Sequence, residues 1–252
     1  MQMTRRFDLI TFDLDGTMLD DEWAHREANR RMGQCLGIDH TQLGPMTGYS
    51  VRMRWQELCR CTGRDLDVEQ LAEEHFRLAL EVIKEAGIPE APGLTATLRT
   101  LKEDGYSIAV VSSSDEWFVR EVTDLLGLTS YLDFFVTQNQ VQRLKPDPES
   151  YLTAQKLAGV PAHRALGIED STPGCQAMRR AGMYSVGFLN GGKNTQALED
   201  TDATIGQMEE LLQTMNARYG DKFLFSGSAN SEAPFSLDAD GNLLFNGKQV
   251  DA

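Results

Sequence analysis

The sequence predicts an α/β protein in which a parallel sheet carries an inserted bundle of helices. An apolar, β-prone stretch at residues 7–14 stands alone near the start of the chain. A long helical stretch follows over about residues 21–85, and from residue 92 onward short apolar stretches alternate with amphipathic ones. Strands that alternate with helices form right-handed βαβ units, which build a Rossmann-like parallel sheet covered on both faces.

The helical stretch has the periodicity of amphipathic helices. Between residues 68 and 86, apolar side chains recur along one helical face. Gly44-Pro45 and Gly63 interrupt the stretch, so we expect about four helices in it.

The alternating part predicts four further strands, at residues 107–111, 134–137, 165–168 and 184–187. The expected helices are at residues 94–103, 116–126, 148–158 and 173–181. Because one strand precedes the helical stretch and the others follow it, we expect a catalytic core of residues 1–20 and 91–218 with a cap at 21–90. Residues 219–252 predict a C-terminal extension with a small hairpin, in which residues 223–225 and 243–245 flank turn residues such as Asp240-Gly241.

Charge and composition exclude several classes of partner. The formal net charge is -14, whereas nucleic-acid binding needs a broad basic face and an anionic membrane attracts basic segments. No apolar run has the length of a membrane span or of a signal-peptide core. The four cysteines have the spacing of neither a zinc site nor a disulfide framework. We therefore expect a cytoplasmic protein that binds a small molecule.

The first strand leads into a pair of carboxylates. Asp13 and Asp15 are two residues apart in extended chain, so their side chains point the same way, and Gly16 permits a tight bend just after them. Two like charges so close disfavour each other's ionisation, which favours one nucleophile and one general acid. A pair of turn-forming aspartates is the alternative, as at Asp238–Gly241, but the preceding buried strand favours chemistry.

Three more polar patches follow later strands. Ser112 and Ser113 come directly after residues 108–111, and a hydroxyl and backbone N–H there can hold a phosphate oxygen. Lys145 precedes Pro146 in a stiff loop and offers a compact positive charge. Glu169-Asp170 follow the next strand and supply oxygen ligands that suit Mg²⁺. Ligands bind at the carboxyl ends of parallel strands, so the four patches are expected to converge.

The ordered set DLDGT, VVSSS, LKPDP and GIEDS resembles the four motifs of the haloacid dehalogenase-like superfamily. The resemblance covers about residues 7–187. The helical stretch between the first two motifs is similar to the helical cap of the branch that contains β-phosphoglucomutase and phosphoglycolate phosphatases.

The resemblance implies a Mg²⁺-dependent phosphatase and a role for each matching residue. Asp13 would attack phosphorus and form an aspartyl-phosphate, while Asp15 would serve as general acid and then base. Asp13, the Asp15 backbone carbonyl and Asp170 would hold Mg²⁺, with Glu169 as a further contact. The phosphoryl oxygens would be bound by three residues: Ser112, Ser113 and Lys145.

The cap is expected to select the substrate, a small phosphorylated metabolite such as a sugar phosphate. Residues 48–55 form the candidate specificity loop, in which Arg52 and Arg54 suit a carboxylate or second phosphate. The alternative is that both arginines solvate a helix while Trp55 packs inside the cap.

Two other functions stay open. In a β-phosphoglucomutase-like enzyme the phosphate would pass to a sugar hydroxyl; His25 falls where the resembling mutases carry a hinge histidine. Asp21, however, replaces the hydroxyl residue expected there, and Lys84, the only lysine between residues 21 and 90, lies away from the expected position. A non-catalytic protein that binds a phosphometabolite is the other alternative, which the intact set of motif residues disfavours.

Overall fold

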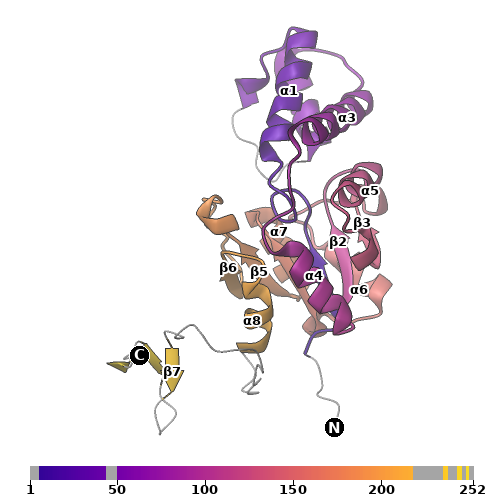
Figure 1. The fold of residues 1–252 in the computed structure, drawn as a ribbon. Coiled ribbons are helices and arrows are strands. Elements are labelled where there is room, and N and C mark those ends of the chain that lie inside the picture. The colour runs from indigo at the N-terminus through magenta and orange to yellow at the C-terminus, as the bar shows by residue number, and fades with distance from the viewer. Residues whose placement is uncertain (1–5, 44–49, 218–234, 238–242, 246–247, 250–252) are drawn as a thin grey trace. The chain divides into compact units, whose positions relative to one another are not determined.

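The computed structural model describes residues 6–43, 50–217, 235–237, 243–245 and 248–249. The chain forms two compact units, Met1–Ala217 and Arg218–Ala252. Figure 1 shows the larger unit as an α/β assembly whose early helices, in purple, lie together beyond one end of the sheet. No helix among the described residues combines the length and apolar character needed to cross a bilayer.

The larger unit contains a six-stranded sheet in the order β3-β2-β1-β4-β5-β6, and all five pairings are parallel. The strands are β1 (Leu9–Phe12), β2 (Ser107–Val111), β3 (Phe134–Val136), β4 (Ala165–Glu169), β5 (Tyr184–Phe188) and β6 (Ala203–Ile205). The predicted fold class is confirmed. The sequence-based prediction missed β6, whose three residues, Ala-Thr-Ile, do not form a continuous apolar run.

Of the four α-helices described between β1 and β2, the first three form the insertion: α1 (Glu22–Leu36), α2 (Val51–Thr62) and α3 (Val68–Ala86). The local sequence defines their ends. Ser50 accepts a hydrogen bond from the Met53 backbone N–H at the start of α2, and Asp67 accepts two at the start of α3. Gly87 ends α3 in the left-handed conformation, with φ of 61°.

The insertion leaves the sheet and returns at neighbouring positions. Leu19 and Glu90 form an antiparallel bridge, and the Ala91 backbone N–H donates to the Met18 carbonyl at 2.7 Å. The structure thus has the predicted inserted helical bundle. The boundaries at residues 21 and 90 stay a prediction.

The remaining helices alternate with the strands. They are α4 (Leu94–Glu103), α5 (Glu116–Leu125), α6 (Glu149–Ala158), α7 (Thr172–Arg180) and α8 (Glu210–Ala217). Short 3-10 helices complete the unit: η1 (His40–Leu43), η2 (Thr129–Tyr131), η3 (Gln138–Gln140), η4 (Ala162–Arg164) and η5 (Asn190–Gly192). The sequence-based prediction contained no element corresponding to α8.

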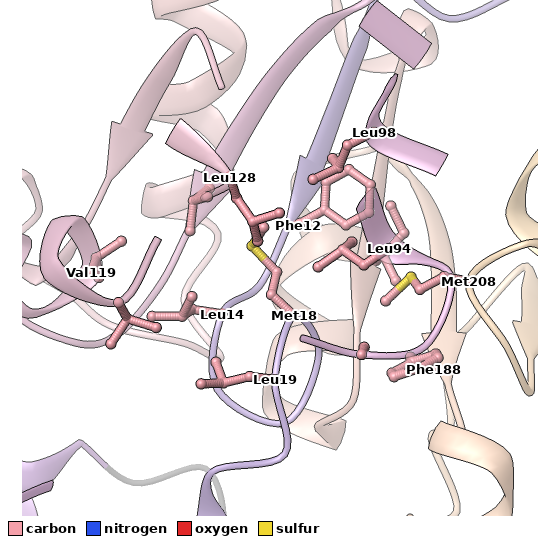
Figure 2. Close-up of a cluster of buried hydrophobic side chains, with 14 of the residues drawn as sticks. Phe12, Leu14, Met18, Leu19, Leu94, Leu98, Val119, Leu128, Phe188 and Met208 are labelled. Atoms are coloured by element: carbon pink, nitrogen blue, oxygen red, sulfur yellow. The ribbon is translucent and has the colours of Figure 1, made fainter. Parts of the chain in front are cut away.

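The two faces of the sheet bury different clusters, because successive side chains of a strand point to opposite faces. Ile10 and Phe12 belong to a cluster with apolar side chains of α4, α5 and α8, part of which Figure 2 shows. Leu9 belongs to a second cluster with Tyr151 of α6 and Met178 of α7. A third, smaller cluster lies within the insertion and contains Trp55, which is 1% exposed. Trp55 therefore packs in the cap, as the alternative interpretation expected.

The smaller unit contains an antiparallel sheet of β7 (Phe235–Leu237), β8 (Leu243–Phe245) and β9 (Lys248–Gln249). Phe235 is paired with Phe245, and Leu237 with Leu243. Residues 223–225 and the expected turn around Asp240-Gly241 lie outside the described residues. The extension of residues 219–252, as a boundary, stays a prediction.

Candidate active site

The sheet topology brings the first and fourth motifs together. β1 is the central strand from which the chain proceeds outward to β2 and β3, before β4 pairs with its other edge. The Asp13 backbone N–H donates to the carbonyl of Ile168 at 3.0 Å, just beyond the paired residues Phe12 and Ile168. Asp13 and the Glu169-Asp170 pair therefore lie at the topological switch point of the sheet, where open α/β folds bind ligands.

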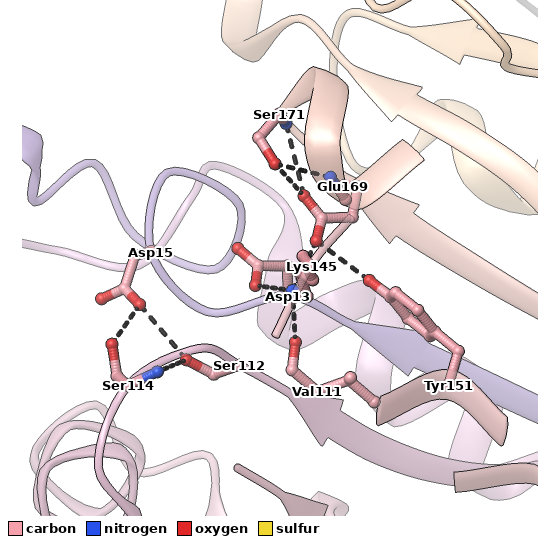
Figure 3. Close-up of polar contacts among 10 residues, drawn as sticks. Asp13, Asp15, Val111, Ser112, Ser114, Lys145, Tyr151, Glu169 and Ser171 are labelled. Atoms are coloured by element: carbon pink, nitrogen blue, oxygen red, sulfur yellow. Dashed lines mark hydrogen bonds and ion pairs between the residues drawn. The ribbon is translucent and has the colours of Figure 1, made fainter. Parts of the chain in front are cut away.

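Lys145 joins these two strand ends (Figure 3). Its Nζ lies 2.5 Å from an Asp13 carboxylate oxygen and 2.5 Å from a Glu169 carboxylate oxygen, and it donates to the Val111 carbonyl at 2.8 Å. The Lys145 side chain is only 6% exposed. A lysine from a loop far along the chain thus neutralises charge beside the expected nucleophile.

Further hydrogen bonds hold Glu169 in place. The hydroxyl of Tyr151 donates to Glu169 Oε1 at 2.9 Å, and that of Ser171 donates to Glu169 Oε2 at 2.9 Å. Gly174 makes room for the carboxylate, because a Cβ there would lie 2.0 Å from Glu169 atoms. Glu169 is fully buried, and these contacts fix its orientation.

The buried acidic groups perturb one another. Burial raises the pKa of Asp13 well above its ordinary value, and the charge of Glu169 raises it further, while Lys145 opposes the shift. Burial and Glu169 likewise raise the pKa of Asp170. For Lys145, burial favours the neutral amine, but the charges of Asp13 and Glu169 outweigh it and raise the pKa above the ordinary value. One ammonium therefore faces three carboxylates.

The donor set fits a divalent cation. Asp13, Glu169 and Asp170 each offer a carboxylate oxygen, and these oxygens lie within 4.8 Å of one another. Gly16 has φ of +80°, and a Cβ there would lie 2.1 Å from Asp170 Oδ2, so the backbone can approach this carboxylate only because residue 16 is glycine. All-oxygen donors around excess negative charge are the environment that Mg²⁺ prefers.

Asp15 occupies a separate polar environment. Its Oδ2 accepts hydrogen bonds from Ser114 Oγ at 2.8 Å and from Ser112 Oγ at 3.3 Å (Figure 3), while its Oδ1 lies 3.3 Å from His25 Nε2. Burial alone would raise the pKa of Asp15, but the hydrogen bond and charge of His25 outweigh burial and hold it below the ordinary value. Of the two aspartates, Asp13 is thus the one whose ionisation is disfavoured. The sequence argument weighed only the two carboxylates and did not include His25.

A cavity of about 700 Å³ opens over these groups. Among the predicted site residues it is lined by Asp13, Asp15, Ser113, Lys145, Asp170 and Arg54. Ser112, Glu169 and Arg52 are not among the described residues that line it. Ser112 donates to the lining carboxylate of Asp15, and Glu169 forms an ion pair with the lining Lys145. Arg52 instead makes ion pairs with Glu69 and Asp115.

Several residues at the site were not predicted. Asn194 and Gln196 donate to the Asp170 backbone carbonyl at 2.6 Å and 3.2 Å, and both line the cavity. The Nε2 atom of His75, on α3, lies 2.9 Å from the Nδ1 atom of His25. The sequence features that could have identified these residues are weak, because polar loop residues and a histidine on a helix are common at any protein surface. Only the fold brings them to the motifs.

Comparisons with known proteins agree with this geometry. Residues 10–188 match the model of the haloacid dehalogenase-like hydrolase family. The validoxylamine A 7'-phosphate phosphatase of Streptomyces hygroscopicus subsp. limoneus is 28% identical, over 81% of this chain and 96% of that protein. A phosphorylated carbohydrates phosphatase of Thermotoga maritima is 27% identical, over 82% of this chain and 97% of that protein.

A crystal structure of β-phosphoglucomutase from Clostridium difficile has the same fold. It superposes with a TM-score of 0.70 and 24% identity, over 84% of this chain and 98% of that chain. The family model covers most of the chain, and the superposition extends over the inserted helices as well as the sheet. The chain therefore belongs to the haloacid dehalogenase-like hydrolase family.

Proposed function

We propose that the chain is a Mg²⁺-dependent phosphatase that hydrolyses a small phosphomonoester through an aspartyl-phosphate. One observation carries the proposal: the Asp13 carboxylate faces the cavity at the end of the central strand, 2.5 Å from Lys145 and beside Asp170. A nucleophile, a fixed positive charge and a metal-ligand set at one point are the parts that phosphoryl transfer needs. The names of the two relatives described above, a validoxylamine A 7'-phosphate phosphatase and a phosphorylated carbohydrates phosphatase, support it.

In the proposed reaction, an Asp13 oxygen attacks phosphorus and the bond from phosphorus to the substrate oxygen breaks. Asp15 gives a proton to the departing oxygen and then takes one from the water that attacks the aspartyl-phosphate. His25 Nε2 lies 3.3 Å from Asp15 Oδ1. Burial alone would lower the pKa of His25, but the hydrogen bonds and charges of Asp15 and Asp21 outweigh burial and raise this pKa to about 10. The proton that Asp15 delivers is therefore held between Asp15 and His25.

Lys145 and Ser113 would bind the phosphoryl oxygens, while Ser112 orients Asp15 through its 3.3 Å contact. Mg²⁺, when bound by Asp13, Asp170 and the Asp15 carbonyl, would supply a Lewis acid that neutralises the phosphoryl charge. Glu169 would act through Lys145, which it contacts at 2.5 Å.

We propose that Arg54 binds the part of the substrate distant from the phosphate. Arg54 lines the cavity, and its guanidinium donates a long hydrogen bond of 3.4 Å to the His40 carbonyl. Burial lowers the pKa of its guanidinium, and no described carboxylate is paired with it. An anionic or hydroxyl-rich group would provide the missing partner. Arg52, already paired with Glu69, would instead hold the cap against Asp115.

The test is phosphate release from a panel of hexose, pentose and glycolate phosphates, with Mg²⁺ and with EDTA. The proposal predicts release that requires Mg²⁺, and the best substrate identifies what the cavity recognises. β-Glucose 1-phosphate belongs in the panel with its product identified, because the contact of His25 with Asp15 also suits a mutase. Its conversion to glucose 6-phosphate without phosphate release would favour the mutase. Binding of phosphometabolites without turnover would favour the non-catalytic alternative.

We also propose a cytoplasmic location. The support is chemical: all four cysteines are free thiols, as expected for a protein kept in a reducing compartment. Its acidic charge gives no basic face for nucleic acid, so the proposed partner is the small phosphorylated metabolite alone.

A further inference from the structure

A second group of side chains that can bind a metal ion adjoins the Mg²⁺ site described above and shares one residue with it, Asp15, whose backbone carbonyl is the proposed Mg²⁺ ligand. Asp15, Asp21 and His25 each offer one ligand atom, and these atoms lie within 4.8 Å of one another. His25 Nε2 is 3.3 Å from Asp15 Oδ1 and 3.5 Å from Asp21 Oδ2. All three residues line the cavity, so the group is reached from solvent by the same opening as the substrate.

Asp21 is the feature that points to a ligand. Its side chain is 0% exposed, and neither carboxylate oxygen accepts a hydrogen bond from any described residue. Its Oδ2 lies 3.5 Å from His25 Nε2. A buried carboxylate without hydrogen bonds is costly unless a cation compensates it.

The spacing matches a small tetrahedral ion. Ligand bonds of about 2.0–2.1 Å in a tetrahedral site separate neighbouring ligand atoms by about 3.3–3.4 Å. The two separations from His25 Nε2, 3.3 Å and 3.5 Å, have this length. A site of one imidazole and two carboxylates suits Zn²⁺, whereas Mg²⁺ prefers oxygen donors throughout.

The surrounding contacts orient the three ligands as outer contacts of metal sites do. His75 Nε2 lies 2.9 Å from His25 Nδ1 and accepts its hydrogen, which directs the other nitrogen of His25 towards the carboxylates. His75 is buried, and burial lowers its pKa well below the ordinary value, so it is a neutral acceptor. Ser114 binds Asp15 Oδ2 at 2.8 Å and leaves Oδ1 facing His25 (Figure 3).

We propose that Asp15, Asp21 and His25 form an inhibitory site for Zn²⁺. Zn²⁺ would bind at His25 Nε2 in place of the proton held there, and that proton would pass to solvent. The inhibitory part rests on the proposed function: with Asp15 Oδ1 bound to the ion, Asp15 could neither give a proton to the leaving oxygen nor take one from water. The binding part rests on geometry alone.

The binding test is a titration of Zn²⁺ against a chromophoric chelator in excess Mg²⁺. A Cys35→Ser/Cys61→Ser background removes the two exposed thiols, which could otherwise take up the metal. Asp21→Asn and His25→Gln each remove one ligand. Their matched controls, Asp20→Asn and His40→Gln, change the same residue types at other positions of the same cavity. Circular dichroism verifies that each variant is folded.

We expect one Zn²⁺ to bind despite excess Mg²⁺. The Zn²⁺ affinity should fall by at least about tenfold in Asp21→Asn and in His25→Gln, because even the loss of a residue that only supports a metal ligand lowers metal affinity by about tenfold or more. The two controls should bind as the background does. Displacement of Zn²⁺ by Mg²⁺ would overturn the proposal, as would equal losses in the ligand variants and their controls.

Phosphate release from the best substrate, with and without Zn²⁺ at saturating Mg²⁺, separates this inference from the proposed function. Turnover without any Zn²⁺ binding would contradict the proposed Zn²⁺ site and would still support the proposed phosphatase activity. Zn²⁺ binding in a protein that hydrolyses no phosphomonoester would contradict the proposed phosphatase activity and would still support the Zn²⁺ site. Zn²⁺ binding that does not slow hydrolysis contradicts the inhibitory role.

Discussion

Replacement of Lys145 by methionine tests the charge balance of the site. The substitution keeps an unbranched side chain of similar length and removes the ammonium that lies 2.5 Å from both Asp13 and Glu169. All three side chains are at most 10% exposed, so water cannot replace the lost partner. Removing one member of a buried ion pair costs about 3–5 kcal/mol, because the remaining charge is left uncompensated.

The matched control is Lys193→Met. Lys193 forms an ion pair with Asp20 at 3.0 Å, but its side chain is 70% exposed, and exposed pairs contribute about 0–1 kcal/mol. In urea unfolding at neutral pH with EDTA, Lys145→Met should lower the midpoint by about 1–2 M, for a slope of about 3 kcal/mol per M. The loss should shrink at acidic pH, where protonation discharges Asp13, whose pKa is raised above its ordinary value. Equal midpoints for the two variants would refute the reasoning.

Three further predictions concern the metal and substrate groups. Gly16→Ala should weaken the apparent Mg²⁺ affinity, measured from activity against Mg²⁺ concentration, because its Cβ would lie 2.1 Å from Asp170 Oδ2; unchanged affinity would contradict the geometry. In the unsubstituted protein that affinity should still rise with pH above the range in which an ordinary carboxyl group titrates, since the raised pKa values of Asp13 and Asp170 mean that protons compete with the ion there; a flat profile would contradict the shifts. Arg54→Gln should raise KM by about 10–100-fold with little change in kcat, whereas Arg52→Gln should not; the reverse order would place the substrate elsewhere.

The parts of the fold that follow repeating patterns could be predicted from the sequence. The strand at Ser107–Val111 and the helix at Leu94–Glu103 have the expected bounds, because each is a complete apolar or amphipathic period between turn residues. β6 has no such pattern, because a threonine interrupts its apolar residues. α8 lies beyond the last motif, where no expectation had been placed.

At the site, the sequence located groups at strand ends, and the parallel sheet brings them together. It could not give the partners that come from other elements. Tyr151 was read only as part of a helix, yet its hydroxyl reaches Glu169. Asp21 was considered only as a departure from the mutase pattern, and its burial beside His25 depends on how α1 leaves the sheet. Which of Arg52 and Arg54 lines the cavity likewise depends on the rotation of α2 about its axis, and the apolar periodicity does not define that rotation to within one residue.

The most direct test of the central claim is the rate of Mg²⁺-dependent phosphate release by Asp13→Asn, compared with Asp20→Asn. Both aspartates line the cavity, but only Asp13 contacts Lys145. With Asp13 as the nucleophile, Asp13→Asn should lose about 10⁴-fold or more in kcat with a native circular dichroism spectrum, while Asp20→Asn remains active. Turnover by Asp13→Asn at the rate of the unsubstituted protein would contradict the account.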